Sequence, residues 1–413
     1  MAELPVIIIG AGIVGISTAL WLRRAGKSVC VLDRGEVGMG ASYGNAGLLA
    51  ACAMVPVTTP GLGAKGPLLL LNRNFPLFLR WPYLPKLAPW LRQYLTHAND
   101  SDTRRIASGL ADITTDSVAQ HDALAGSTTA QKWLTHSDYA FAYKDRTAFQ
   151  TDSYAWQLRE AAGFTPQLIE GRAAREYEPL LAPATSLLAV VKGHGYVQDP
   201  ARYVQALAAV LKAEGGEIRQ AEVVDIELSE GRVRAVITDQ GPMPCAAAVL
   251  TTGAWSKPLM QKLGLNIPLE TERGYHLLFK NPSQMPRQPL MISAGKFVAT
   301  PMAEGLRCAG VVEFGGLKAG PSKPPLAFLH RKVKESFPTL KYAGVEEWMG
   351  HRPTLADSLP MIGEIRNSSV FAGFGHHHIG LTAGPKTGRI LADMITQKRP
   401  NADFSAYDPM RFG

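Results

Sequence analysis

The sequence predicts an α/β protein in which a domain built on a parallel sheet carries an inserted α+β domain with a mixed antiparallel sheet and helices. Three observations support this fold class. A strand, a glycine-rich turn, a helix and a second strand follow one another at the start of the chain, and the buried run Ala246–Thr251 adds a strand much later. Segments around Tyr275–Phe279 and Lys296–Thr300 suggest an antiparallel sheet between them. The length of 413 residues implies two domains, or one large domain with an insertion.

The first unit reads as strand, helix and strand in close succession. Pro5–Ile9 is a β-branched apolar run typical of a buried strand, and Ile13–Arg24 has helical spacing that stops at Gly26. Ser28–Leu32 is the second strand, and Asp33 follows it at once. This order is typical of a Rossmann-like nucleotide-binding unit.

The turn between strand and helix has the spacing Gly10-x-Gly12-x-x-Gly15. One glycine makes the tight turn, the next lets the backbone approach a pyrophosphate, and the third lets helix and strand pack closely. The helix N-terminus adds free N–H groups and partial positive charge. Asp33 suits the ribose hydroxyls and would repel the 2′-phosphate of NADP, although it could instead cap the strand end.

The remaining chain alternates helical and strand-like segments. From Gly38 to Gly66 the composition is that of a loop, and from Pro67 to Leu95 it is aromatic and leucine-rich. Helical spacing occurs at Ser101–Leu124 and Thr151–Ala162, in a helix that ends near Ala213 after a turn at Gly193–Pro200, and in a last helix at Pro385–Gln397. Strand patterns occur at Glu217–Glu227 and Arg232–Thr238.

The bulk composition excludes several classes of protein. The formal charge of +8 is spread along the chain, so we expect no nucleic-acid binding. The four cysteines have neither disulfide-framework nor metal-ligand spacing, which favours a reducing compartment. With no signal peptide and no apolar run long enough to span a bilayer, we expect a cytoplasmic protein, or one bound peripherally to the inner membrane.

Four ordered blocks carry a family resemblance: Gly40–Gly47, Thr251–Ser256, Gly350–Gly363 and Gly373–Thr382. Together with the first unit they resemble the D-amino-acid oxidase and dehydrogenase superfamily of FAD-dependent oxidoreductases. Within this superfamily the chain resembles most the bacterial D-amino-acid dehydrogenases, including those that act on D-proline or hydroxyproline. The resemblance implies an FAD-binding domain at 1–60, 193–262 and 346–413, and a substrate domain at 61–192 and 263–345.

The resemblance also implies which residues hold FAD. In addition to the turn and Asp33, the loop after the second strand would surround the ribityl chain and flavin ring. A later strand would give backbone hydrogen bonds to adenine. The helix that follows the last block would aim its positive end at flavin N1 and C2=O. The residues implied are Gly10, Gly12, Ile13, Val14, Gly15, Asp33, Arg34, Ala41, Ser42, Asn45, Ala46, Gly47, Leu48, Val223, Thr252, Gly253, Trp255, Gly375, His377, His378, Ile379, Gly380, Leu381 and Thr382.

The three adjacent histidines at 376–378 do not suit a metal, because consecutive residues cannot all face one ion and no cysteine or acid cluster lies nearby in the sequence. We expect no metal, and instead a buried or flavin-contacting histidine. A covalent flavin link stays open, although Ser42–Gly47 holds neither histidine nor cysteine.

Four residues are candidates for substrate chemistry. In similar glycine and D-amino-acid oxidases the arginine at the position of Arg352 holds the substrate carboxylate; Arg352 could instead pair with Asp357. Tyr275 or His276 could close the pocket or accept the amine proton, or be plain strand residues, and His378 could contact flavin or substrate. The implied reaction is hydride transfer from Cα of a small amino or imino acid with a neutral amine to flavin N5, leaving an iminium product.

No Asp or Glu occurs between Glu36 and Asp100, where basic and aromatic residues lie among leucines. Residues 67–95 could be a membrane face that lets electrons pass to a quinone or another carrier, or a buried lid over the flavin. The sequence leaves open a glycine or sarcosine oxidase that uses O₂, and, as a further alternative, a flavin-bearing tRNA-modifying protein.

Overall fold

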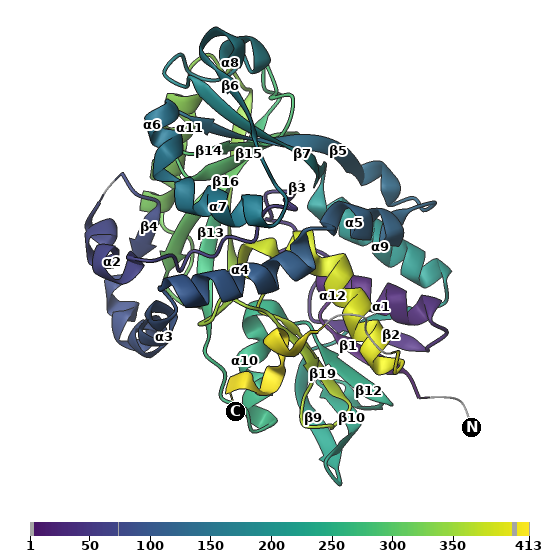
Figure 1. The fold of residues 1–413 in the computed structure, drawn as a ribbon. Coiled ribbons are helices and arrows are strands. Elements are labelled where there is room, and N and C mark those ends of the chain that lie inside the picture. The colour runs from purple at the N-terminus through teal and green to yellow at the C-terminus, as the bar shows by residue number, and fades with distance from the viewer. Residues whose placement is uncertain (1–3, 73, 399–402, 413) are drawn as a thin grey trace.

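The computed structural model describes residues 4–72, 74–398 and 403–412. Its six-stranded sheet is parallel except at one edge. The strand order is β18 (Met361–Glu364), β19 (Val370–Phe374), β12 (Ala247–Leu250), β1 (Val6–Ile9), β2 (Val29–Asp33) and β8 (Glu217–Gln220), with β18 antiparallel to β19. The first, middle and last parts of the chain therefore meet in one sheet (Figure 1).

β1 lies at the centre of this sheet because both of its faces are apolar. Val6 and Ile8 pack on the side of α1 (Ile13–Arg24) and α12 (Gly380–Ile395), whereas Ile7 and Ile9 pack on the opposite side. On that opposite side lies a three-stranded antiparallel sheet of β11 (Gly241–Pro244), β10 (Arg232–Thr238) and β9 (Val223–Ser229). A strand buried on both faces needs no polar alternation.

The larger sheet fills the upper half of Figure 1. Its order is β17 (Gly344–Leu355), β13 (Leu269–Lys280), β16 (Gly305–Phe314), β15 (Phe297–Met302), β14 (Leu290–Ile292), β5 (Leu134–Tyr143), β7 (Leu187–Val197) and β3 (Leu48–Leu49), with β4 (Leu77–Leu79) beside β16 and β6 (Gln167–Glu170) beside β7. This mixed α/β architecture agrees with the predicted fold class. The larger sheet also takes residues 48–49, 193–197 and 346–355, which the sequence assigned to the other domain.

The remaining helices surround the two sheets. They are α2 (Leu62–Leu71), α3 (Leu84–Thr96), α4 (Asp100–Thr114), α5 (Ser117–Ala125), α6 (Arg146–Thr151), α7 (Ser153–Ala161), α8 (Gly171–Tyr177), α9 (Pro200–Ala213), α10 (Ser256–Lys262) and α11 (Lys323–Ser336). The start of α9 is specified locally, since Asp199 accepts a hydrogen bond from Arg202 N at 3.0 Å and Pro200 occupies the first turn.

Two local predictions are wrong. Gly193–Val197 is the end of strand β7 and not part of a turn, because it pairs with β5 and β3. The last helix begins at Gly380, so Pro385 lies inside it and not near its start. The predicted helix at 101–124 divides into α4 and α5.

Candidate cofactor and substrate site

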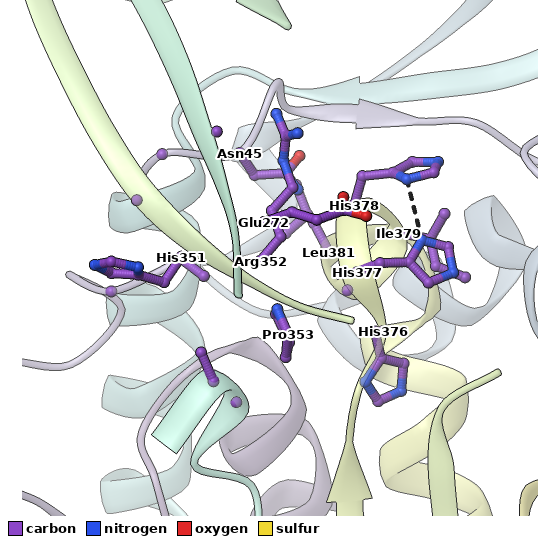
Figure 2. Close-up of a pocket in the computed structure, with 18 of the residues that line it drawn as sticks. Asn45, Glu272, His351, Arg352, Pro353, His376, His377, His378, Ile379 and Leu381 are labelled. Carbon is purple, nitrogen blue, oxygen red and sulfur yellow. Dashed lines mark hydrogen bonds between the residues drawn. The ribbon is translucent and has the colours of Figure 1, made fainter. Parts of the chain in front are cut away.

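A single cavity of about 1140 Å³ extends between the two sheets. Its lining runs from the glycine-rich turn after β1, past the loop at 38–55 and the start of α12, to strands β13, β16 and β17 of the larger sheet. Figure 2 shows its part around Arg352 and the three histidines. The cavity is therefore long enough to join the nucleotide-binding turn to the wall of the larger sheet.

The glycine-rich turn has the close contacts that its spacing predicts. A Cβ on Gly15 would lie 1.9 Å from the Gly10 carbonyl oxygen, and one on Gly10 would lie 2.6 Å from the Thr251 oxygen. Gly15 thus permits helix packing and does not line the cavity. The Ile13 N–H at the start of α1 donates to Ser42 Oγ at 3.0 Å, so this N–H is already engaged.

Asp33 joins the turn and the end of β2. Its carboxylate accepts hydrogen bonds from Ala11 N at 2.7 Å and Gly35 N at 2.9 Å. It also lines the cavity. Each carboxylate oxygen has a further lone pair, so the capping of the strand end and a bond to a ribose hydroxyl are compatible.

An aromatic and basic wall closes the cavity near the end of β2. The Arg34 guanidinium lies 4.9 Å from the centroid of the Trp255 ring, and both side chains line the cavity with Val223. Thr252 and Gly253, between β12 and α10, line it as well. A flat heteroaromatic ring such as adenine suits such surroundings.

The loop at 42–48 is held by a buried cation that the sequence analysis missed. Arg307 Nη1 donates to the Tyr43 carbonyl at 2.7 Å and to the Asn45 carbonyl at 2.8 Å. Asn45 Oδ1 accepts from Gly47 N at 2.9 Å. Ala41, Ser42, Asn45, Ala46 and Leu48 line the cavity, whereas Gly47, with a φ of 74°, shapes the backbone behind it.

The start of α12 also reaches the cavity through Ile379, Gly380, Leu381 and Thr382. Pro385 cannot donate to the Leu381 carbonyl four residues earlier. Instead His121 Nε2 of α5 donates to that carbonyl at 2.9 Å, while His121 Nδ1 accepts from Tyr203 Oη at 2.9 Å. Burial lowers the pKa of His121 to about 4, so the ring is neutral. Gly375 has a φ of 92° and does not line the cavity.

The three histidines have different surroundings. His376 Nε2 bonds Thr387 Oγ1 at 2.9 Å. His377 has a φ of 36°, which is costly for a side-chain-bearing residue, and its Nε2 donates to the Ser358 carbonyl at 3.0 Å. Its Nδ1 lies 3.0 Å from His378 Nδ1 (Figure 2).

These bonds fix the tautomer of His378. Because a carbonyl only accepts, the single proton of neutral His377 is on Nε2, and its Nδ1 accepts from His378 Nδ1–H. His378 Nε2 then has a free lone pair, and His378 lines the cavity. Burial, with smaller contributions from His377 and Arg352, holds the pKa of His378 well below its usual value.

Arg352 lies over Gly274, where a Cβ would come 2.5 Å from its Cζ. Its guanidinium donates to the carbonyls of Val311 at 3.2 Å and Gly310 at 3.4 Å. The Asp357 alternative is wrong, because Asp357 pairs with Arg411 at 2.7 Å. Arg352 therefore lines the cavity with an ordered guanidinium that makes no ion pair to a carboxylate within the described part of the chain.

Glu272 is the cross-strand partner of Arg352, and the sequence analysis missed it. Its carboxyl is buried and lines the cavity. Burial raises its pKa, and the Arg352 charge opposes this shift. In the sequence Glu272 stands in an ordinary strand pattern, and only the pairing of β13 with β17 brings it to Arg352.

Tyr275 and His276 have their polar atoms engaged elsewhere. Tyr275 lines the cavity, but its Oη donates to Glu313 Oε2 at 2.5 Å and its ring packs in the core of the larger domain. His276 is not among the residues that line the cavity: its Nδ1 donates to the Gly44 carbonyl at 3.1 Å and its ring stacks on Trp348. A Cβ on Gly44 would lie 1.8 Å from the Trp348 ring, so His276 positions a tryptophan wall against the loop.

The segment at 62–95 covers the cavity. Leu69, Leu70, Leu87, Leu91 and Tyr94 line it from α2 and α3. The outer side exposes Trp81 at 57%. The placement of Arg73 lies outside the described residues, as do the side chains of Lys65 and Leu68. No helix within the described ranges is both long and apolar enough to cross a membrane.

Across the described residues no group of three or more His, Cys, Asp or Glu side chains could hold a metal ion. The cradle instead suits a long, flat, anionic cofactor. It combines close backbone approach at Gly10, a helix N-terminus and aromatic walls at Trp255 and Trp348 along one cavity. FAD has this combination of diphosphate and two ring systems.

Comparisons with known proteins agree with this geometry. Residues 5–394 match the family model DAO, described as FAD dependent oxidoreductase. The chain is 37% identical over 98% of both chains to a D-amino-acid oxidase of Bradyrhizobium diazoefficiens, and 29% identical over 96% of both to a D-amino acid dehydrogenase of Methylobacterium nodulans. A glycine oxidase structure from Geobacillus kaustophilus has a TM-score of 0.73 at 21% identity, covering 100% of this chain and 99% of that one. An L-proline dehydrogenase structure from P. horikoshii also scores 0.73, at 18% identity over 99% and 98% of the two chains.

Proposed function

This chain belongs to the DAO family of FAD-dependent oxidoreductases, and we propose that it oxidises the Cα–N bond of a small D-amino acid or cyclic imino acid. FAD is its cofactor, and the chain is an FAD-dependent amino-acid oxidase or dehydrogenase. One observation carries the proposal for the substrate. Arg352 presents an ordered guanidinium to the same cavity that contains the glycine-rich turn.

The proposed residues divide along the cavity by the part of FAD they hold. The turn at Gly10–Gly15 and Asp33 hold the diphosphate and ribose, and Arg34, Val223 and Trp255 surround adenine. Residues 41–48 and 377–382 hold the ribityl chain and flavin. When bound, FAD supplies the acceptor for a hydride from the substrate Cα.

Arg352 orients the substrate by its carboxylate. Two parallel N–H donors suit a carboxylate, and the bonds to the Gly310 and Val311 carbonyls keep the guanidinium plane fixed. Glu272 lies beside it, so the pair complements a zwitterion: Arg352 attracts the carboxylate and Glu272 attracts the ammonium. These two attractions hold the substrate Cα between the charges of Arg352 and Glu272.

His378 accepts the ammonium proton on Nε2. The amine lone pair then becomes part of the C=N bond as the hydride leaves Cα, and an iminium product forms. Water converts an open-chain iminium into a keto acid and ammonium, whereas a cyclic substrate leaves as a pyrroline-type imine. Support for this role is the fixed tautomer of His378 and its lining of the cavity.

His378→Asn tests the proton acceptor. The free amine fraction in solution rises with pH, so the variant should reduce FAD slowly at pH 7 and recover towards pH 9.5, while the parent protein changes less. Anaerobic stopped-flow measurement of flavin bleaching across this range gives the profile. If the rate of flavin reduction depends on pH in the same way in both proteins, His378 is not the proton acceptor.

Two candidate functions, a dehydrogenase and an oxidase, differ in the electron acceptor that reoxidises the reduced flavin. A dehydrogenase that passes electrons to a quinone or another carrier is supported by the exposed residues Trp81, Lys86 and Arg92 in and just before α3. An oxidase using O₂ is supported by the 37% identical relative, which is named an oxidase. To decide between them, the flavin is reduced anaerobically with D-proline or D-alanine and air is then admitted. Return of the flavin colour within seconds, together with formation of hydrogen peroxide, favours the oxidase.

Peripheral membrane contact through 67–95 belongs to the dehydrogenase candidate. Flotation with anionic liposomes tests it, and Lys86→Glu with Arg92→Glu should abolish flotation if the basic side of α3 makes the contact. Absence of flotation by the parent protein would remove the membrane contact and leave these residues as a lid over the cavity.

A further inference from the structure

Arg159 of α7 is a cation whose role the proposed reaction leaves open. Its guanidinium carbon lies 4.7 Å from the ring centroids of both Phe141 and Trp156, and the side chain lines the cavity. Its Nε is buried with no hydrogen-bond partner. Arg159 makes no ion pair within the residues that the structure describes.

A second cation, Lys296, lines the same cavity at the start of β15. Its Nζ lies 3.8 Å from Asp152 Oδ1, and its side chain is 47% exposed, so this pair is loose. Asp152 immediately precedes α7, the helix that carries Arg159, so Lys296 lies near the start of that helix.

No acidic side chain of the cavity complements these two cations. Among its described lining residues, Asp33, Glu36 and Glu222 lie near the end of β2, and Glu272 lies beside Arg352. Within the described residues Arg159 therefore has no carboxylate partner, and Lys296 has only its loose contact with Asp152. Taking a guanidinium partly out of water without an anion is costly, so the part of the wall around Arg159 favours a bound anion.

The anion expected at Arg159 is neither the FAD diphosphate nor the substrate α-carboxylate. The FAD diphosphate belongs at the glycine-rich turn after β1, and the substrate α-carboxylate belongs at Arg352 of β17. The Arg352 guanidinium bonds the carbonyls of Gly310 and Val311 on β16, whereas Arg159 packs on Phe141 of β5. Three strand spacings separate β16 from β5, roughly 14 Å along a flat sheet, so two guanidinium contacts and a short carbon chain can span this separation. Both arginines still reach one cavity, so a ligand that meets both has its two anionic groups at opposite ends of a chain.

We propose that Arg159, assisted by Lys296, binds a second carboxylate at the far end of the substrate, so that the enzyme prefers D-amino acids with acidic side chains. This inference rests on the proposed oxidation of D-amino acids and names the substrate class within it. A guanidinium packed against two aromatic rings still has N–H groups at its edge that can donate to a planar carboxylate. Arg352 and Glu272, whose charges are opposite, receive the zwitterionic end, and Arg159 with Lys296 receives the remaining negative charge.

The length of the cavity adds a chain-length expectation. Because the two guanidinium groups lie about three strands apart, D-glutamate and D-2-aminoadipate should be better substrates than D-aspartate. The neutral isosteres D-glutamine and D-norleucine provide the comparison, since they keep the chain and lack the terminal charge.

Arg159→Met tests the assignment, because methionine keeps an apolar chain on Phe141 and Trp156 but removes the charge. Arg159→Lys keeps the charge, and Arg172→Met removes an exposed arginine elsewhere as the matched control. The first readout is the rate of anaerobic flavin bleaching, taken as the ratio of D-glutamate to D-glutamine. We expect Arg159→Met to lower this ratio about 10- to 100-fold, and Arg159→Lys to lower it less.

The second readout needs no turnover. Glutarate or butyrate is titrated into the FAD-loaded enzyme. Binding is measured from the change in flavin absorbance and from the shift in melting temperature. Glutarate should bind more tightly than butyrate to the parent protein, and Arg159→Met should abolish the difference. Equal binding of the two acids by the parent protein, or an unchanged ratio in Arg159→Met, would overturn the inference.

The two readouts separate this inference from the proposed function. If neutral D-amino acids bleach the flavin well and acidic ones no better, the oxidation stands and the Arg159 assignment fails. If no amino acid bleaches the flavin, the proposed function fails, and the glutarate measurement still decides whether Arg159 binds a carboxylate.

Discussion

Replacing Arg352 with methionine tests the substrate anchor and the charge balance of the site together. The substitution removes the donors to a carboxylate and also the positive partner of Glu272 on the neighbouring strand. Losing a charge-assisted, two-donor contact costs about 3–4 kcal/mol, which corresponds to roughly a 150- to 1000-fold fall in the rate of flavin reduction at low substrate.

The same substitution should destabilise the fold by a calculable amount. Opposite charges at a separation of about 6 Å and an effective dielectric constant of about 20 attract each other by about 3 kcal/mol. With an unfolding entropy of about 2.1 cal/mol/K per residue over 413 residues, this is a fall of about 3 °C in melting temperature.

Glu272→Gln in the same protein separates the two effects. It removes the uncompensated carboxylate, so Arg352→Met with Glu272→Gln should recover most of the melting temperature while flavin reduction stays low. Differential scanning fluorimetry and anaerobic stopped-flow give the two quantities, and retained FAD absorbance shows that the cofactor site is intact. Normal reduction by Arg352→Met would refute the carboxylate anchor, and a melting temperature unaffected by Glu272→Gln would refute the charge coupling.

Two further predictions concern the cofactor loop and the buried histidines. Gly44→Ala should displace the Trp348 ring, which a Cβ would approach to 1.8 Å, and should lower FAD retention on gel filtration. Gly344→Ala, with open space around its Cβ and a position outside the cavity lining, should retain FAD like the parent protein. Burial lowers the pKa of His121 and of His194 to about 4, below the 6.5 of an unfolded histidine. Because the unfolded chain then binds more protons, stability should be constant above pH 7 and fall from pH 6.5 towards pH 4, by about 3 kcal/mol for each histidine. Thermal unfolding at pH 8, 6 and 5 measures this, and a melting temperature that rises on acidification would contradict it.

The sequence predicted the first nucleotide-binding unit well because its structure is set by local pattern. Ile13–Arg24 is helical with the predicted bounds, since apolar spacing and Gly26 determine both ends. The carboxyl end of β2 carries Asp33 against the turn, as the spacing from Gly15 implies. Such features need only residues near one another in the chain.

The residues that complete the site escaped prediction because they depend on distant pairing. Glu272 reaches Arg352 only through the register of β13 and β17, and Arg307 reaches the loop at 42–48 only across the larger sheet. Tyr275 was a reasonable candidate by position, yet its hydroxyl bonds Glu313. Strand alternation predicts that neighbours face opposite ways, but it does not tell which face meets a cavity.

The position of β1 between β2 and β12 has a consequence for biosynthesis. Thr251, at the end of β12, bonds the carbonyl of Ile9 across a separation of 242 residues. At about 5–20 residues per second, a ribosome needs roughly 12–48 s to make that interval. During this time one edge of an entirely apolar strand has no partner, and the last strands and α12 are made later still. We therefore expect FAD to bind only after these last elements have been made, and the open edge of β1 to be exposed to pairing with other chains until then.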